Sequence, residues 1–285
     1  MRIVHSDSSA MAESFFREYT SEAAVRKYSP GTAGRGISYL LEHDYKDIYL
    51  YALGLLPPGV MTEGLQILEF GCGVGMNLMH LTSILQQEGF PVARAVGTDF
   101  SPVLIETAKY EAKEYQRNGG PEKFYFQVAR TENLTADISS ALECNRSDLE
   151  GSFHFILGVN TIRYCHAAKK QLDAVREIFN LLVPGGVCVI IDMNDRFPMF
   201  RSDLKNLLRW KKEPQCYIPS LEEYAAPFSK TGFEVVRFEH FCWIPHSAGT
   251  VRLGVMRALR PFLNLVAKSR AMRSVVIAKK PAGGV

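Results

Sequence analysis

Ile67 to Leu78, ILEFGCGVGMNL, is the stretch of the chain that decides its fold. It begins with an apolar run that carries one acid, Glu69, and three glycines follow at alternate positions, Gly71, Gly73 and Gly75. Glycine adopts positive φ angles without a steric penalty and lets the backbone approach a ligand closely. Because a helix-compatible segment, residues 76–87, comes next, the stretch predicts a strand, a tight turn and a helix.

The spacing of the glycines bears on the cofactor. A dinucleotide-binding turn needs G-x-G-x-x-G, and Met76 stands where the third glycine of that pattern would fall. The observed E-x-G-x-G-x-G instead resembles motif I of class I S-adenosylmethionine-dependent methyltransferases. That resemblance implies S-adenosylmethionine as the cofactor and S-adenosylhomocysteine as its product. The residues of the motif that it implies for binding are Glu69, Gly71, Cys72, Gly73 and Gly75.

The second predicted strand, residues 93–99, ends in Asp99. A carboxylate at the tip of such a strand can accept hydrogen bonds from both ribose hydroxyls of a nucleoside, and Phe100 beside it could pack on the adenine. Nicotinamide enzymes also place an acid at this position. Asp99 therefore favours S-adenosylmethionine only in combination with the glycine spacing.

Two further loops at the same end of the predicted strands are candidates for the cofactor site. Residues 129–134 resemble the family loop G-D-A-E-N-L, but Arg130 stands where that family has the aspartate that binds the adenine amino group. Backbone atoms near Thr131 could hold the base instead. The fourth strand contains Gly158 and is followed by Asn160. Ligands of open α/β sheets lie outside the carboxyl ends of the strands. These two residues are therefore also candidates for binding the cofactor.

The segment just beyond the fourth strand contains the candidate catalytic residues. Methyl transfer to an amine, a carboxylate or a thiolate needs no strong base, whereas transfer to a hydroxyl is helped by a base with a pKa near neutrality, histidine first. His166 is therefore the first candidate for a base, with Tyr164 and Arg163 beside it. Arg163 could instead anchor a substrate carboxylate or phosphate.

The remaining histidines bear on which residue could act as the base, and residues 160–163 bear on the class of substrate. His246 is the second candidate for a base, whereas His80 in a helix and His154 inside a strand are expected to be structural. The DNA-amine methyltransferases have (D/N)-P-P-(Y/F) after the fourth strand, and this chain has N-T-I-R at 160–163. Methylation of duplex DNA is thereby disfavoured.

The order of the later motifs extends the resemblance. A predicted helix at 168–182 leads into an L-x-P-G-G turn and an apolar strand at 187–192, as in the same family. In that family the final two strands form a hairpin with the last strand inserted antiparallel, and residues 233–241 and 273–280 fit those strands. The prediction is a doubly wound α/β fold with a mostly parallel seven-stranded sheet, helices on both faces and an antiparallel last strand.

The chain outside this core suggests where an acceptor could bind. Residues 1–60 are expected to form an N-terminal helical lid, with helices at 10–28 and 38–56, before a core at 61–285. By resemblance to small-molecule methyltransferases, three lid residues are candidates for contacts with cofactor or substrate: Tyr28, Arg35 and Tyr39.

Two insertions into the core, near residues 193–228 and 242–272, are the expected substrate-binding elements. The second contains a basic amphipathic helix before Pro261, with Val251, Val255 and Leu259 at helical spacing. Its apolar side could face the substrate opening, a partner subunit or lipid, or pack on its own domain.

Composition and charge limit the class of protein and the compartment in which it is expected. The chain has 285 residues, 47% of them hydrophobic and 22% charged, which is typical of a globular protein. Six dispersed cysteines without C-x-x-C or zinc spacing indicate a reduced, cytoplasmic protein without a metal site. No segment approaches a transmembrane helix or a leader. The net charge is +3, yet residues 240–285 hold eight Lys or Arg and no Asp or Glu.

These observations predict a methyltransferase that acts on an O, N or C atom of a small acceptor, as a monomer or homodimer. Anionic acceptors of the secondary-metabolite type are among the candidates. Three alternatives stay open. An RNA methyltransferase could use the basic C-terminal region, although no RNA-binding module is apparent, so nucleic acid is disfavoured as a partner. The chain could also be a non-catalytic S-adenosylmethionine-binding partner protein. An NAD(P)-dependent oxidoreductase is disfavoured by the missing third glycine.

Overall fold

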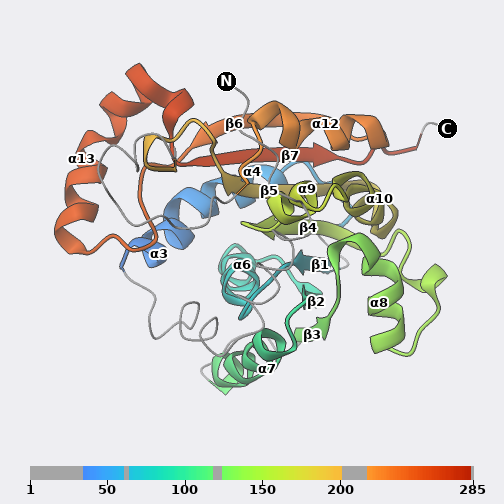
Figure 1. Cartoon of the computed structure of the whole chain (residues 1–285). Helices are drawn as coiled ribbons and strands as arrows, with labels where there is room; N and C mark the ends of the chain where they lie inside the picture. Colours follow the sequence, from blue (N-terminus) through green and yellow to red (C-terminus); the bar gives the residue numbers. More distant parts are fainter. Residues whose placement is uncertain (1–34, 61–63, 118–123, 201–216, 284–285) are drawn as a thin grey trace.

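A single seven-stranded sheet organises the computed structural model, which describes residues 35–60, 64–117, 124–200 and 217–283 (Figure 1). The strand order is β3-β2-β1-β4-β5-β7-β6. Neighbouring strands from β3 to β5 pair in parallel, and β7 pairs antiparallel with both β5 and β6. The strands are β1 (Leu65–Phe70), β2 (Val92–Asp99), β3 (Phe124–Val128), β4 (Phe153–Val159), β5 (Leu182–Met193), β6 (Glu234–Phe241) and β7 (Arg273–Lys279). This confirms the predicted sheet and its antiparallel last strand.

Helices cover both faces of the sheet. One face packs against α4 (Lys46–Leu53), α6 (Met76–Gln87) and α7 (Pro102–Arg117). The other packs against α8 (Leu134–Ala141), α9 (Ile162–Ala167), α10 (Gln171–Leu181) and α12 (Leu221–Thr231). We call these the α6 face and the α12 face. Alternate residues of the central strands enter the two cores, as the side-chain period of a strand requires.

The predicted helix 38–56 is a composite of three elements. It consists of α3 (Arg35–Tyr39), the π-helical segment η2 (Leu40–Tyr45) and α4. Tyr49 of α4 is fully buried and packs edge-on against Phe155 of β4 at a centroid distance of 6.5 Å. Tyr49 thus attaches this segment to the α6 face. The predicted helix 10–28 lies outside the described residues.

Two predicted helix boundaries were wrong for local reasons. The predicted helix 168–182 begins at Gln171 as α10, and Lys169 in the left-handed region, φ 59°, separates it from α9. On the same face, α8 ends at Ala141, and Glu143 beyond it has φ 52°. Such angles interrupt a right-handed helix. The predicted helix before Pro261 instead runs through that proline as α13 (Thr250–Ala267).

Candidate functional site

The glycine turn after β1 is held in place by Glu69. The Glu69 carboxylate is fully buried and accepts hydrogen bonds from the Leu78 N–H at 2.9 Å and from the Asn77 amide at 3.2 Å. Both donors lie in the first turn of α6, whose N-cap residue, Gly75, has no side chain to accept them. Burial raises the pKa of Glu69 to about 8, against the opposing effect of these donors. Glu69 therefore caps the N-terminus of α6 from the buried side of the glycine turn.

The glycines of the turn differ in what surrounds them. Gly71, Gly73 and Gly75 have φ of 61°, 55° and 80°. A Cβ on Gly71 would lie 2.2 Å from Thr161 Oγ1, and one on Gly75 would lie 2.8 Å from the Phe126 ring, so both positions are small to admit neighbours. A Cβ on Gly73 would meet no atom within 4 Å. The open side of the turn is therefore at Gly73.

Asp99 faces this open side from the tip of β2. Its carboxylate accepts the Gly73 N–H at 3.0 Å and the Ser101 N–H at 2.9 Å, and Asp99 is 6% exposed. Burial raises the pKa of Asp99, while these N–H groups oppose the shift. The backbone N–H of Phe100 is a third donor to this carboxylate. Since a carboxylate offers about four acceptor positions, acceptor capacity remains for a hydroxyl group of a ligand.

The other predicted cofactor residues have the following positions. Cys72 is buried next to the turn, and burial raises the pKa of its thiol well above the usual value, so the thiol stays protonated. Phe100 is half-buried beside Asp99, and the side chain of Arg130 is exposed. Thr131 begins a short 3-10 turn, η3 (Thr131–Asn133). A Cβ on Gly158 would lie 2.2 Å from the Phe70 ring, so this glycine makes room for packing.

Asn160 connects the glycine turn to a polar cluster. It adopts φ 57°, which asparagine tolerates, and its N–H donates to Ile191 O at 2.7 Å. The adjacent Thr161 hydroxyl donates to Gly71 O at 3.3 Å. The Asn160 side-chain oxygen accepts a hydrogen bond from Arg273 at the start of β7. The cluster therefore lies at the same edge of the sheet as the glycine turn.

Arg273, His246 and Tyr45 complete this cluster. A second Arg273 nitrogen lies 2.8 Å from His246 Nε2, and the Tyr45 hydroxyl lies 3.3 Å from the same atom. Burial, followed by the charge of Arg273, lowers the pKa of His246 to about 3, so the imidazole is neutral and its Nε2 serves as an acceptor. Arg273 is 6% exposed, its Nε is buried without a hydrogen-bond partner, and no carboxylate pairs with it among the described residues.

The predicted catalytic residues contact neighbouring elements of the fold and are not part of the polar cluster around Arg273. Arg163 forms a buried ion pair with Asp192 of β5 at 2.8 Å and donates to the Tyr164 hydroxyl at 2.7 Å. Its charge is thus already matched by a carboxylate. His166 is 8% exposed and packs edge-on against Tyr224 of α12. Burial lowers the pKa of His166 to about 4, so this imidazole is also neutral at pH 7.

The two histidines expected to be structural, His80 and His154, contact the backbone of neighbouring elements. His80 Nε2 lies 2.6 Å from Leu41 O, and burial lowers the pKa of His80. His154 Nδ1 accepts the Gln66 N–H at 3.0 Å. Both histidines therefore join neighbouring elements of the fold.

Of the lid candidates, Tyr39 is the one whose side chain the structure describes. Its ring packs on His43 at a centroid distance of 4.4 Å, and its hydroxyl accepts a hydrogen bond from Arg260 of α13 at 3.3 Å. Arg35 is the first residue of α3. Tyr28 lies outside the described residues.

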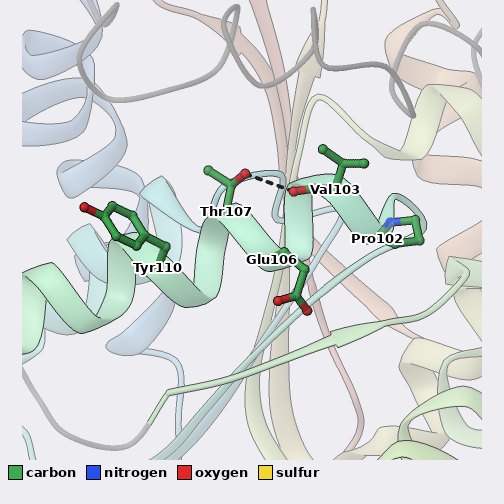
Figure 2. A pocket seen from close by; sticks show the side chains of 5 residues that line it. All are labelled: Pro102, Val103, Glu106, Thr107 and Tyr110. Atoms are coloured by element: carbon green, nitrogen blue, oxygen red, sulfur yellow. Dashed lines mark hydrogen bonds between the residues drawn. The ribbon is translucent and has the colours of Figure 1, made fainter.

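A hollow of about 530 Å³ lies along α7 (Figure 2). Thr107 in its wall donates to Val103 O at 2.9 Å, so this hydroxyl is satisfied within the helix. The lining residues all belong to α7: Pro102, Val103, Glu106, Thr107 and Tyr110. The hollow includes neither the glycine turn nor the polar cluster, and we assign neither cofactor nor acceptor to it.

Sequence reasoning missed most of the polar cluster. In the sequence, Arg273 is one of the eight basic residues at 240–285, and no motif singles out Tyr45. The available signal was weak: Arg273 begins a strand that is otherwise apolar, SVVIA, and a cation at the end of such a strand needs a polar environment.

A family model for the methyltransferase domain matches residues 35–237 of the chain. Among curated proteins, the non-reducing polyketide synthase sor2 of Hypocrea jecorina is 31% identical over 132 residues, 46% of this chain and 4% of the synthase. Uncharacterized protein RP028 of Rickettsia prowazekii is 30% identical over 140 residues, 48% of this chain and 45% of that protein. The matched region thus spans less than half the length of either relative.

Solved structures show the same fold at low identity. The magnesium protoporphyrin IX methyltransferase ChlM of Synechocystis PCC 6803, with bound SAH, has a TM-score of 0.57 and 12% identity, covering 94% of this chain and 99% of that chain. The CurJ carbon methyltransferase has a TM-score of 0.55 and 16% identity, covering 96% and 71%. The chain therefore belongs to the methyltransferase-domain family, and its fold is that of the class I S-adenosylmethionine-dependent methyltransferases.

Proposed function

We propose that the protein transfers a methyl group from S-adenosylmethionine to an O, N or C atom of a small-molecule acceptor. The observation that carries the proposal is the open side of the glycine turn at Gly73, where a Cβ would meet no atom within 4 Å, facing the Asp99 carboxylate. The membership of the methyltransferase-domain family supports the methyl donor over a nicotinamide cofactor.

The chain's own residues would bind and orient the cofactor. Asp99 would accept the ribose hydroxyls through the lone pairs that Gly73 and Ser101 leave available. The backbone at Gly73 would approach the ligand closely, because no side chain intervenes. Phe100 and the backbone near Thr131 would hold the adenine. When bound, S-adenosylmethionine supplies an activated methyl group on a sulfonium leaving group, so the protein contributes mainly positioning and exclusion of water.

The polar cluster suggests the class of acceptor. Neither His166 nor His246 suits the deprotonation of a hydroxyl, because their pKa values lie near 4 and 3, far below neutrality. An acceptor that is already nucleophilic near neutral pH, such as a carboxylate, a thiolate or an unprotonated amine, needs no such base. Arg273 is a buried cation that donates to two neutral groups, and an anionic acceptor would supply its missing counter-charge. Arg273, rather than Arg163, is therefore our proposed anchor.

The comparison with polyketide synthases supports an acceptor of the secondary-metabolite type. The fungal synthase sor2 and the citrinin polyketide synthase of Monascus ruber, 27% identical over 136 residues, match this chain over about half its length. An anionic group on such an acceptor could pair with the Arg273 guanidinium.

Titration calorimetry with S-adenosylhomocysteine tests the cofactor proposal. We expect Asp99→Asn to bind at least about tenfold more weakly, because an amide replaces a charged acceptor of two ligand hydroxyls, each worth roughly 1.5 kcal/mol or more. Glu106→Gln, an acid on the exposed side of α7, is the control and should bind like the parent protein. Tight binding of NADH with no heat from S-adenosylhomocysteine would refute the proposal.

A further inference from the structure

Helix α13 lies at the margin of the molecule (Figure 1). It exposes a continuous apolar stripe. None of its residues is buried. Six large apolar side chains are exposed: Val251 82%, Val255 52%, Leu259 45%, Phe262 61%, Leu265 84% and Val266 59%. At 100° per residue they share an arc of about 120° on one side of the helix. Single exposed apolar residues are ordinary, but a contiguous stripe over several turns marks an interaction surface.

The opposite side of α13 is attached to the domain. Arg260 forms an ion pair with the buried Asp44 carboxylate of η2 at 2.7 Å. The Arg257 guanidinium lies over the Tyr39 ring at 5.0 Å, and Leu253 and Met256 pack against the core of the α6 face. These contacts determine which side of the helix faces outward. The apolar stripe is therefore a stable feature of the surface.

The charge around the stripe is positive. Arg252 is exposed at its edge, and Arg270 is exposed just after the helix. Neither forms an ion pair with a carboxylate in the part of the chain that the structure describes. From His240 to Val285 the sequence contains no Asp or Glu. Two copies of α13 placed face to face would bring these cations together without a compensating acid, which disfavours a second copy as the occupant.

We propose that α13 docks the protein on an anionic lipid surface. The stripe would enter the boundary between headgroups and acyl chains, and Arg252 and Arg270 would contact lipid phosphates. The helix would lie in the plane of the surface, since no helix among the described residues is long and apolar enough to cross a bilayer. This inference does not depend on the methyl acceptor. It predicts where the enzyme acts rather than what it methylates.

Vesicle flotation of the full chain tests the proposal. The probes are vesicles of phosphatidylcholine alone and vesicles with equal parts of phosphatidylcholine and phosphatidylglycerol. We expect binding to the mixed vesicles, at least about tenfold weaker binding to the neutral ones, and loss of binding at high salt, because salt screens exposed charges.

Two double variants and their matched controls separate the contribution of the apolar side chains to vesicle binding from that of the arginine charges. Val251→Ser with Leu265→Ser changes the two most exposed residues of the stripe and should weaken binding about tenfold. Arg252→Gln with Arg270→Gln should abolish the preference for phosphatidylglycerol. Controls elsewhere on the surface should bind like the parent: Tyr110→Ser, an apolar residue that is 62% exposed on α7, and the exposed Lys230→Gln.

Three outcomes would overturn the proposal. The folded chain could fail to bind mixed vesicles, or bind neutral and anionic vesicles equally. Alternatively, light scattering could show a dimer that Val251→Ser with Leu265→Ser converts to a monomer, without vesicle binding. That last result would assign the stripe to a second copy of the chain.

Discussion

Glu69 contacts the helix that follows the glycine turn rather than the open side of the turn. The acid of the E-x-G-x-G-x-G motif lies on the buried side of the turn and caps α6. It thereby holds the first helical turn next to Gly73. Its predicted place among the cofactor-binding residues becomes, in our proposal, a positioning role.

The raised pKa of Glu69 predicts a stability change with pH. The pKa is about 8 in the folded protein, against 4.5 for an ordinary solvent-exposed glutamate. Between these values the unfolded chain has lost a proton that the folded chain keeps, so stability falls as pH rises. From pH 5 to pH 8 the loss attributable to Glu69 should be about 3 kcal/mol. Urea denaturation of ligand-free protein at both pH values measures it.

Glu69→Gln is the control for this effect, because the amide stays neutral throughout the range. Other titrating groups are common to both proteins, so the difference between their pH profiles isolates Glu69. Parallel profiles for the parent and Glu69→Gln would show that the carboxyl group ionises normally in the folded state.

At the scale of the element, the strand–turn–helix unit of β1 and α6 depends on left-handed backbone positions. Gly71 and Gly75 are also held by neighbours that leave no room for a Cβ. Gly73 is different, because only its φ angle and the space beside Asp99 restrict it. Substitution at Gly73 can therefore separate backbone strain from ligand binding.

Gly73→Ala and Gly89→Ala form a matched pair. Both glycines have positive φ, 55° and 77°, and a Cβ at either position would meet no atom within 4 Å. Each substitution should cost about 1 kcal/mol of stability through backbone strain. Only Gly73→Ala places a methyl group in the proposed cofactor space. We expect it alone to weaken S-adenosylhomocysteine binding, about tenfold by calorimetry, and equal affinities for the two variants would contradict this assignment.

At the scale of the whole molecule, the polar cluster joins segments that are distant in the sequence. Arg273 comes from the antiparallel last strand, Asn160 from the end of β4, and Tyr45 from η2. His246 comes from the excursion between β6 and β7. The sheet topology brings these segments together at the edge that also carries the glycine turn.

Arg273→Gln tests whether the cluster holds an anion. Methyl transfer from labelled S-adenosylmethionine would be screened against carboxylates and phenolates and against their neutral ester or ether analogues. For anionic acceptors we expect kcat/KM to fall about tenfold or more, since a charged hydrogen bond contributes roughly 1.5 to 3 kcal/mol. Affinity for S-adenosylhomocysteine should be unchanged, and Arg273→Lys should retain part of the activity.

The substitution Arg146→Gln removes one exposed positive charge and is the matched control. It should leave kcat/KM for anionic acceptors and the affinity for S-adenosylhomocysteine unchanged. If Arg273→Gln lowered transfer to anionic and neutral acceptors equally, Arg273 would be structural rather than an anchor. The imidazole of His246 gives an independent check by NMR. Its pKa, about 3 in the parent, should rise when the nearby positive charge is removed.

Local sequence determined the order and type of the core elements. The glycine turn, Asp99 at the tip of β2, and the Ser101 and Pro102 start of α7 were predictable because each depends on φ angles, caps or side-chain period within a few residues. The capping box of Ser220 and Glu223 at the start of α12 has the same local character. Those elements could be read from the chain without knowing what packs against them.

Tertiary structure alone decided which polar groups meet. Arg163 and Arg273 look equally available in the sequence, yet Arg163 is paired with Asp192 in the fold, whereas Arg273 donates only to uncharged partners among the described residues. Asn160 and Arg273 lie 113 positions apart. Burial and pairing depend on strand order and on which face of the sheet each side chain enters. The sequence therefore determined the fold and the glycine turn that we propose as the cofactor site, and packing between distant segments decided the charges that would face an acceptor.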